Sequence, residues 1–239
     1  MKLVDLSQEI IHKDKFGQHA AHPSPLIFTY VSHEESRQQL AGGVTKDYSY
    51  TSEWINLSSH AGTHLDAQWH TNSDPQSMTI DQIPLEWCYG DAVCLDLSHK
   101  APQSWIDPED LESACDSAKI MVQPGDILLL YTGHWNRSKG KPSYSSDNPG
   151  LSQAGVRWIF EKRVKLFGID AVAPDNPVDQ TERKFFPAHD LLRDFGIPHL
   201  ENLANLDKVS GKRFVFMGFP IKLRGASAGW VRAVALLNE

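Results

Sequence analysis

The sequence predicts a single α/β domain built on a mixed β-sheet with several helices. The chain has 239 residues, which is long enough to bury one large core. Its candidate strands outnumber its candidate helices and do not alternate with them regularly, which argues against a doubly wound sheet. Neither an internal repeat nor a low-complexity linker divides the chain. We therefore expect one domain over residues 1–239.

The strands are predicted from short apolar segments bounded by turn-forming residues. The turn Gln123-Pro124-Gly125, for example, precedes the apolar segment Asp126–Tyr131. Residues 12–53 are polar and rich in turn formers, so we expect a long excursion with a hairpin near Leu26–Ser32. The predicted sheet strands are Lys2–Ile10, Asp91–Leu97, Asp126–Tyr131, Lys165–Ala171, Phe214–Phe219 and Trp230–Leu237.

Three helices are predicted from their end signals. Asp107 followed by Pro108 reads as an N-cap with proline at the first helical position, which predicts a helix over 108–118. Ser152 is the expected N-cap of a helix over 152–163. A third helix is expected over 188–195, where Gly196 would end it.

The composition excludes several classes of protein. The net charge is −7 and the pI about 5.9, with no run of lysine or arginine, which argues against nucleic acid or an anionic membrane surface as the main partner. No segment approaches the roughly 20 apolar residues that cross a bilayer, and no apolar signal segment follows Met1. The cysteines Cys88, Cys94 and Cys115 lack metal-like spacing, so we expect reduced thiols in a cytoplasmic protein.

Four residues with metal-ligand chemistry fall within eleven positions, at His60, His64, Asp66 and His70. On a helix His60 and His64 would share a face, but Asp66 would point away. On a straight strand all four would share a face, but His60 and His70 would lie ~33 Å apart. Neither regular structure brings the four together. We therefore expect the chain to curl, and Gly62 permits a sharp bend.

Two neutral imidazoles and a carboxylate suit Zn²⁺, Mn²⁺ or Fe²⁺. Three protein ligands would leave a position open for water, which is typical of catalytic sites, whereas structural zinc sites are closed and rich in sulfur. The alternative is a histidine-rich surface loop, or histidines satisfied by ordinary hydrogen bonds. The density of ligand-type residues favours the metal site.

The segment His-Ala-Gly-Thr-His-Leu-Asp-Ala-Gln-Trp-His at 60–70 resembles the signature His-x-Gly-Thr-His-x-Asp-x-x-x-His. That signature belongs to the cyclase-like metal hydrolases, which include bacterial kynurenine formamidases and isatin hydrolases. The resemblance implies their swivelling β/β/α type of fold and extends over nearly the whole chain. Weaker matching motifs follow in the same order, at Asp5–Ser7, 128–133, 168–170, 189–192, 201–203 and 231–233.

The resemblance also implies a ligand set. His60, His64 and Asp66 would bind one divalent ion. Asp66 would in addition bridge to a second ion held by His189 and Glu201. Some relatives hold a single Mn²⁺, so one ion or two, and Zn²⁺ or Mn²⁺, remain open.

His70 is similar to the proton-transfer residue of the family. An imidazole with a pKa near neutrality can accept a proton from water and donate it to a leaving nitrogen. The alternatives are a support for the ligands or an additional ligand. Two places earlier, Gln68 stands where the family usually has proline, which would loosen the turn and add a polar group beside the site. Trp69 could shield His70 from bulk water.

The function that follows is hydrolysis of a carbon–nitrogen amide bond by metal-activated water. One interpretation is an arylformamidase acting on a linear amide of the N-formylkynurenine type. Another is hydrolysis of a cyclic amide such as an isatin-like lactam, or the reverse ring closure. The third is a metal-binding protein without turnover.

The substrate-binding candidates are His22, Trp54 and Trp69, because aromatic residues near the motif suit an aryl-bearing small-molecule amide. By resemblance we also expect a homodimer or a larger homo-oligomer. The segment 12–53 is the candidate arm across its interface.

Overall fold

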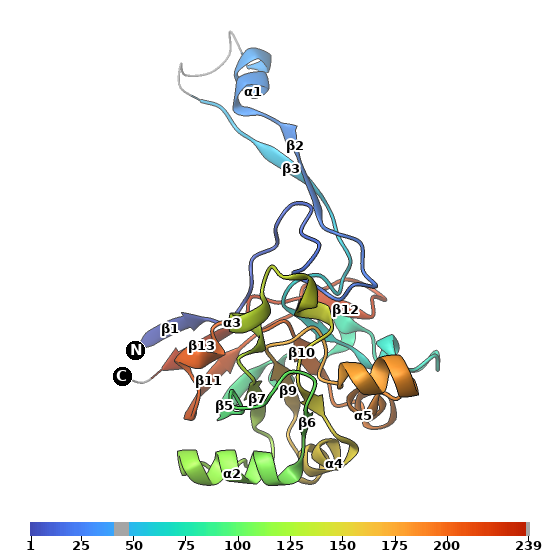
Figure 1. Ribbon diagram of the computed structural model, residues 1–239. Coiled ribbons are helices and arrows are strands. Elements are labelled where there is room, and N and C mark those ends of the chain that lie inside the picture. Colours follow the sequence, from blue (N-terminus) through green and yellow to red (C-terminus); the bar gives the residue numbers. More distant parts are fainter. Residues whose placement is uncertain (41–47, 238–239) are drawn as a thin grey trace.

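The computed structural model describes residues 1–40 and 48–237. Its centre is a nine-stranded curled mixed sheet, with helices packed against it (Figure 1). In spatial order the strands are β1 (Lys2–Asp5), β13 (Val234–Leu237), β11 (Lys212–Met217), β5 (Tyr89–Asp96), β7 (Ile127–Tyr131), β9 (Leu166–Ile169), β10 (His199–Glu201), β4 (His64–Asp66) and β12 (Ala228–Trp230).

The sheet is mixed, as the sequence predicts. Strands β5, β7, β9 and β10 run parallel, and the pairs on either side of them are antiparallel. Strand β4 lies between β10 and β12 and is antiparallel to both. This position matters for function, because β4 carries two residues of the histidine-rich segment.

The two faces of the sheet bury separate apolar clusters. On β5, Val93 and Leu95 belong to the cluster that contains apolar residues of the helices, whereas Ala92 and Cys94 belong to the cluster on the other face. This alternation follows from the two-residue period of a strand. The covering helices are α2 (Pro108–Ala118), α4 (Gln153–Glu161) and α5 (Pro187–Phe195).

The three predicted helices are present with nearly the predicted bounds. At the start of α2 the backbone N–H of Asp107 donates to Asp110 Oδ2 (2.9 Å). Ser152 Oγ accepts from the backbone N–H of Gly155 (3.1 Å) at the start of α4. Helix α5 ends at Gly196, whose φ of 65° is the left-handed conformation that glycine adopts readily.

Several predicted strand limits were wrong. The first strand ends at Asp5 and not at residue 10, because the chain then crosses toward Leu203 and Ser7 forms only an isolated bridge there. The last predicted strand is divided into β12 and β13. The predicted hairpin near Leu26–Ser32 is a single strand, whose partner lies at 52–56.

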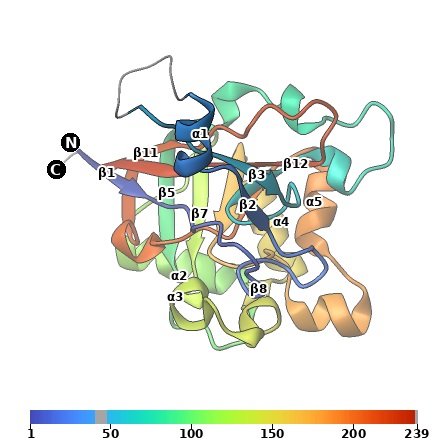
Figure 2. The ribbon, with the colours of Figure 1, turned by 90° about the horizontal axis from the view of Figure 1, so that it is seen from above.

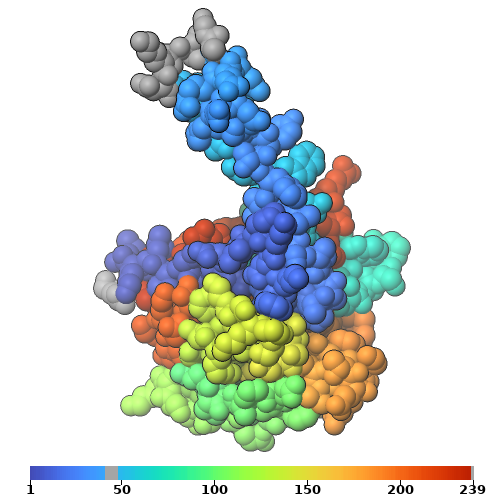
Figure 3. All heavy atoms as spheres, turned by 45° about the horizontal axis from the view of Figure 1, so that its top comes forward, coloured from blue at the N-terminus to red at the C-terminus, as the bar shows by residue number. Residues whose placement is uncertain are grey.

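Residues 26–40 and 48–56 form an arm that projects from the body (Figures 1 and 3). Its described elements are the antiparallel strands β2 (Leu26–Val31) and β3 (Ser52–Asn56) and the helix α1 (His33–Gln39). The arm exposes large side chains, among them Tyr30 and Trp54, which are 69% and 62% exposed. The arm therefore contributes little to the core of this chain.

The remaining elements are short. The strands β6 (Trp105–Ile106) and β8 (Gly150–Leu151) form a two-stranded parallel sheet, visible in part in Figure 2, and α3 (His134–Ser138) is a single short helix. Within residues 1–40 and 48–237, none of the helices is long and apolar enough to cross a membrane. The 3₁₀ and π turns are at Gln68–His70, Ile80–Gln82, Leu85–Trp87, Pro142–Ser145, Asp179–Arg183 and Leu206–Lys208.

Candidate metal centre

The segment 60–70 curls as its spacing requires. Gly62 has a φ of 64°, a conformation that a β-carbon would strain, and Ile10 lies against the place where that carbon would stand. The bend turns His60 back over the start of β4. After β4 the chain enters a 3₁₀ turn that ends at His70. A bend, a short strand and a tight turn thus bring together side chains that a straight strand would separate.

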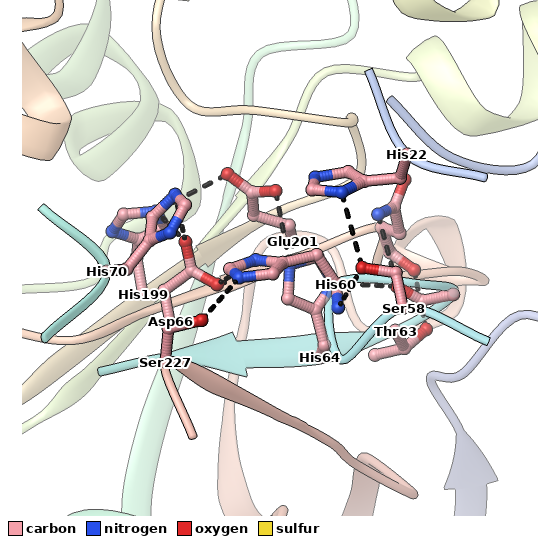
Figure 4. Close-up of polar contacts among 12 residues, drawn as sticks. His22, Ser58, His60, Thr63, His64, Asp66, His70, His199, Glu201 and Ser227 are labelled. Atoms are coloured by element: carbon pink, nitrogen blue, oxygen red, sulfur yellow. Dashed lines mark hydrogen bonds and ion pairs between the residues drawn. The ribbon is translucent and has the colours of Figure 1, made fainter. Parts of the chain in front are cut away.

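The first group of candidate ligands is His60, His64 and Asp66, all buried. His60 Nδ1 lies 2.9 Å from Asp66 Oδ1, and His64 Nε2 lies 3.2 Å from the same oxygen. Figure 4 shows these side chains converging above β4. The three residues predicted from the spacing therefore meet at one carboxylate oxygen.

The second group surrounds the other oxygen of Asp66. His199 Nε2 lies 3.5 Å from Asp66 Oδ2, and His189 Nε2 lies 3.9 Å from it. Glu201 Oε1 is 3.4 Å from His199 Nε2 and 3.8 Å from His189 Nε2. Its other oxygen, Oε2, is 3.4 Å from His64 Nε2. Both carboxylates thus contact histidines of the two groups.

The register of two strands builds this second group. Because β10 pairs antiparallel with β4, His199 stands opposite Asp66 and Glu201 stands opposite His64. His189 reaches the same place from α5. The structure thus places His189 and Glu201 beside Asp66, and their binding of a metal stays a prediction.

His199 is a candidate ligand that the sequence motifs do not identify. A signal was present, because His199 and Glu201 are two residues apart and so share one face of a strand. Recognising it required knowledge that residues 199–201 form a strand beside β4.

Three of the histidines are oriented by contacts to their other ring nitrogen. His60 Nε2 lies 3.0 Å from Ser227 Oγ, and His64 Nδ1 lies 2.9 Å from the carbonyl oxygen of Gly62. His189 Nδ1 contacts Asp175 Oδ2. Each contact leaves the opposite ring nitrogen directed at the carboxylates, as in metal sites where outer groups fix the ligand tautomer.

The pKa values of the cluster show that its two carboxylates carry negative charge, which a cation would balance. Burial opposes charge on His64, but Asp66 and Glu201 raise its pKa to about 10. Burial likewise opposes charge on Asp66, yet His60 and His64 hold the pKa of this carboxyl well below its usual range. Glu201 is buried beside Asp66, but His199 and His64 lower its pKa to about 2. Two buried carboxylates therefore stay anionic.

The cluster also leaves buried polar atoms without partners. Among the described residues no well-aligned hydrogen bond reaches either oxygen of Asp66, Glu201 Oε1, His64 Nε2 or either ring nitrogen of His199. Leaving such groups unsatisfied is costly unless another partner, such as an ion, is present. Nitrogen and oxygen donors without sulfur suit a borderline or hard divalent cation. The residues fit a divalent metal centre, in which Asp66 offers one oxygen to each group of candidate ligands.

His70 lies at the edge of the centre and not within either ligand group. Its Nε2 is 3.6 Å from Asp66 Oδ2, and its side chain is 30% exposed. Burial lowers the pKa of His70 to about 4, and the neighbouring His60 and His189 act in the same direction against Asp66 and Glu201. The imidazole is therefore neutral at neutral pH and can accept a proton.

A cavity of about 450 Å³ opens beside the cluster. His22 lines it and stacks on His60, with ring centroids 5.0 Å apart and an interplanar angle of 4°. The cavity has the size of a small-molecule site. Other side chains on its wall include His19, Thr71, Val172, Gln180, Phe186 and Arg193.

Two predicted substrate-binding residues lie outside this cavity. Trp54 is on β3 in the arm, and Trp69 is 38% exposed and is not among the lining residues. For Trp69 the cause is the 3₁₀ turn at Gln68–His70, which brings His70 to the cluster and leaves the neighbouring Trp69 outside it. The aromatic side chain on the wall is Phe186, whose ring meets His189 edge-on at 6.3 Å.

Gln68 does not loosen the turn that carries His70. Its Nε2 donates to the carbonyl oxygen of Arg193 (2.9 Å), and its Oε1 accepts from the backbone of Met78 (3.4 Å). The side chain thus ties this turn to the end of α5 instead of adding a polar group to the site.

The chain is similar to several known proteins. Residues 4–176 match the model of the family described as "putative cyclase". A kynurenine formamidase of Salinibacter ruber is 31% identical over 186 residues, covering 75% of this chain and 77% of the relative. An isatin hydrolase of Roseibium aggregatum is 25% identical over 200 residues, covering 78% of this chain and 74% of the relative.

A solved structure shares the fold. Isatin hydrolase A from Ralstonia solanacearum superimposes with a TM-score of 0.82 at 21% identity, covering 99% of this chain and 92% of that one. The matched residues 4–176 include the segment 60–70 but not His189, His199 or Glu201. The argument for His199 therefore rests on geometry alone, whereas for His189 and Glu201 the geometry adds to the resemblance described above.

Proposed function

The chain belongs to the cyclase family, and from that premise we propose that it is a metal-dependent hydrolase that opens a carbon–nitrogen amide bond. One observation carries the proposal. Two groups of candidate nitrogen and oxygen ligands, all buried except the partly buried His189, share Asp66 and lie beside an open cavity, with a neutral imidazole at the edge. A purely structural metal site would be closed and would not need the cavity or the imidazole.

We propose that two divalent ions, Zn²⁺ or Mn²⁺, bind here. His60, His64 and Asp66 would hold one, and Asp66 with the second group, His189, His199 and Glu201, would hold the other. A bound divalent ion lowers the pKa of water toward 7 and stabilises the negative charge that develops on a carbonyl oxygen.

His70 supplies the proton transfer in this proposal. Its neutral imidazole accepts a proton from the attacking water and then donates a proton to the departing nitrogen. Both transfers are needed, because an amide has a poor leaving group. The position of His70 beside Asp66, but outside both ligand groups, suits this role.

We propose an aryl amide as the substrate, with a linear formamide of the N-formylkynurenine type as the main candidate. Support comes from the names of the formamidase relatives and from Phe186 on the cavity wall. A cyclic amide such as an isatin-like lactam is the second candidate, because an isatin hydrolase aligns over 200 residues. Gln180 and Thr71 provide polar groups on the same wall.

The deciding experiment is a panel of amides assayed with defined metals. Metal-free protein reloaded with Zn²⁺ or Mn²⁺ is given N-formylkynurenine, isatin and an aliphatic formamide. Formate release identifies the linear reaction, and loss of the lactam absorbance identifies ring opening. Binding of metal without turnover of any amide would contradict the proposal and leave a metal-binding protein without activity.

Replacing Phe186 by alanine tests the aromatic wall. We expect kcat/KM for an aryl amide to fall at least about 10-fold, the order expected for lost apolar contact in a pocket, with little change for the aliphatic formamide. Phe195→Ala is the matched control, since Phe195 is on α5, exposed and outside this cavity. Equal losses on both substrates would contradict an aromatic contact.

We also propose a homo-oligomer whose arm packs on a second copy. The support is the arm itself, because Tyr30, Trp54 and Ile55 expose apolar surface that this chain does not cover. Light scattering at micromolar concentration should give at least twice the chain mass, and a Tyr30→Ser/Trp54→Ser variant should shift toward the monomer. Met121→Ser, an exposed site on the body, is the control. A monomeric parent protein would end this proposal.

A cytoplasmic location is part of the proposal. It rests on the three free cysteines, of which Cys88 and Cys94 are buried, and on the absence of metal-like spacing among them. Cell fractionation of the source organism tests it.

A further inference from the structure

We infer that Asp175 is a positioning residue of the metal centre, which fixes His189 as a ligand through its Nε2 atom while it caps the helix that carries His189. The inference rests on the proposed metal site but does not depend on the substrate. Asp175 has no exposed surface and is not itself within either ligand group.

The backbone around Asp175 is clamped in place. Asn148 Nδ2 donates to the carbonyl oxygen of Asp175 (3.3 Å), and the backbone N–H of Leu151 donates to that of Pro174 (2.8 Å). Gly150 packs directly on this segment, so closely that a β-carbon there would lie 2.4 Å from the carbonyl carbon of Asp175. Only glycine permits that approach. These contacts therefore hold the backbone of Asp175, and with it the position from which its carboxylate extends.

The carboxylate caps α5 from outside the helix. The N-cap residue, Phe186, has no side chain that can accept a hydrogen bond, and Pro187 has no N–H. Asp175 instead accepts from the next two backbone N–H groups, with Oδ1 2.6 Å from Ala188 N and Oδ2 3.4 Å from His189 N. A negative charge at this end of a helix is also favourable for the helix dipole. The first turn of α5 is thereby held to the same carboxylate.

The same carboxylate fixes the imidazole. His189 Nδ1 donates to Asp175 Oδ2, which leaves Nε2 directed at Asp66 Oδ2 (3.9 Å) and Glu201 Oε1 (3.8 Å). Hydrogen bonds to both the backbone and the ring of His189 restrict where its Nε2 can lie. Outer carboxylates of this kind also make the histidine a stronger ligand.

This role requires that both side-chain oxygens of Asp175 accept hydrogen bonds, one from Ala188 N and the other from His189 Nδ1. In Asp175→Asn the remaining carbonyl oxygen can still accept from Ala188 N, so most of the cap survives. The new amide group, however, would present N–H toward His189 Nδ1. That opposes a proton on Nδ1 and favours the tautomer with the proton on Nε2, in which Nε2 cannot bind a metal.

The test is metal binding by Asp175→Asn, measured by chelator competition on the full chain with Zn²⁺ alone. We expect one of the two ions to bind about 10- to 100-fold more weakly, the usual effect of removing an outer carboxylate, while the other keeps its parental affinity. Asp194→Asn is the matched control, because it removes the same charge from an exposed place on α5. Parental affinity for both ions in Asp175→Asn would overturn the inference.

A second measurement separates positioning from helix capping. In zinc-loaded protein labelled with ¹⁵N-histidine, the His189 Nδ1–H resonance should be protected from solvent exchange. It should be lost or shifted in Asp175→Asn and unchanged in Asp194→Asn. If Asp175→Asn does not fold, the measurement on the parental protein still tests the inference. A His189 Nδ1–H that exchanges rapidly with solvent would contradict it. An inactive parental enzyme that shows these metal effects would refute the proposed reaction and leave the role of Asp175 intact.

Discussion

The metal centre has two halves that are built in different ways. His60, His64 and Asp66 come from one short segment, and a bend at Gly62 and a three-residue strand suffice to gather them. The other half is assembled from α5 and β10, which lie more than a hundred residues further along the chain. Asp66 belongs to both halves. A local fold can therefore gather the first group of candidate ligands, but the second group depends on how strands and helices pack.

The two halves also differ in the groups that hydrogen-bond to the outward-facing ring nitrogens of their histidines. The ring nitrogens of His64 and His60 that face away from the cluster meet neutral groups, a carbonyl oxygen and a hydroxyl. His189 meets the buried carboxylate of Asp175. The dispersed half thus uses a charged support where the contiguous half uses neutral ones. This comparison predicts different sensitivities to substitution.

Asp66→Asn should have the largest effect, because Asp66 is a member of both groups of candidate ligands. Replacing the carboxylate by an amide removes the negative charge that faces His60, His64 and His199. We expect metal content and turnover both to fall to background while circular dichroism shows an intact fold. Retention of one tightly bound ion would mean that one half does not need Asp66.

His70→Ala should come next, with kcat reduced by roughly 10²–10⁴ and metal content unchanged. Metal analysis and steady-state kinetics measure both. Restoration of the rate by added metal would instead make His70 a ligand.

The pH profile of kcat/KM tests the same role. Burial lowers the pKa of His70 to about 4, so its neutral form, which accepts the proton, predominates at neutral pH. Activity that depends on it should fall as pH drops toward that pKa. His70→Ala should lack this acidic limb, and an unchanged profile shape would contradict proton transfer by His70.

His199→Ala should separate the two halves. Loss of a direct ligand should lower the affinity for one ion by at least about 10- to 100-fold, which is the usual effect of removing a residue that only hydrogen-bonds to a ligand. The ion held by His60, His64 and Asp66 should stay bound. His60→Ala should do the reverse. Titration with Zn²⁺ counts the ions in each variant. Equal weakening of both ions by either change would show that the halves are not independent.

Asp170→Asn should have the smallest effect on the site, because Asp170 lies outside both ligand groups. Burial raises its pKa to about 6, although hydrogen bonds from Thr132 oppose this rise. The folded state therefore retains a proton between pH 3.8 and about 6 that the unfolded chain releases. The stability contributed by this proton is complete below pH 3.8 and is lost as pH rises through about 6.

The free energy of unfolding of the metal-free protein should therefore fall between pH 4 and pH 7 by up to about 3 kcal/mol more in the parent than in Asp170→Asn. Urea unfolding at several pH values measures the difference. Zinc affinity should be equal in the two proteins. Parallel stability curves would mean that Asp170 is ionised in the folded protein at low pH.

Local interactions explain what could be predicted without the structure. The helix over 108–118 was found with its correct bounds, because its capping group and proline lie next to the residues they affect. The grouping of His60, His64 and Asp66 followed from the reach of a short segment around Gly62. The parallel and antiparallel mixture of the sheet followed from the many strands and few helices. His189 and Glu201 came from the family resemblance and not from their spacing.

The tertiary structure alone decided which distant residues join the centre. His199 enters it because of the register between β10 and β4, and no local signal sets that register. Asp175 supports His189 because Gly150 lets two segments approach closely. Phe186, and not Trp54 or Trp69, lines the cavity, because the arm carries Trp54 away from the body. A sequence thus determined the chemistry of one short segment, whereas strand register and packing determined which side chains complete it, since those contacts join residues that are far apart in the chain.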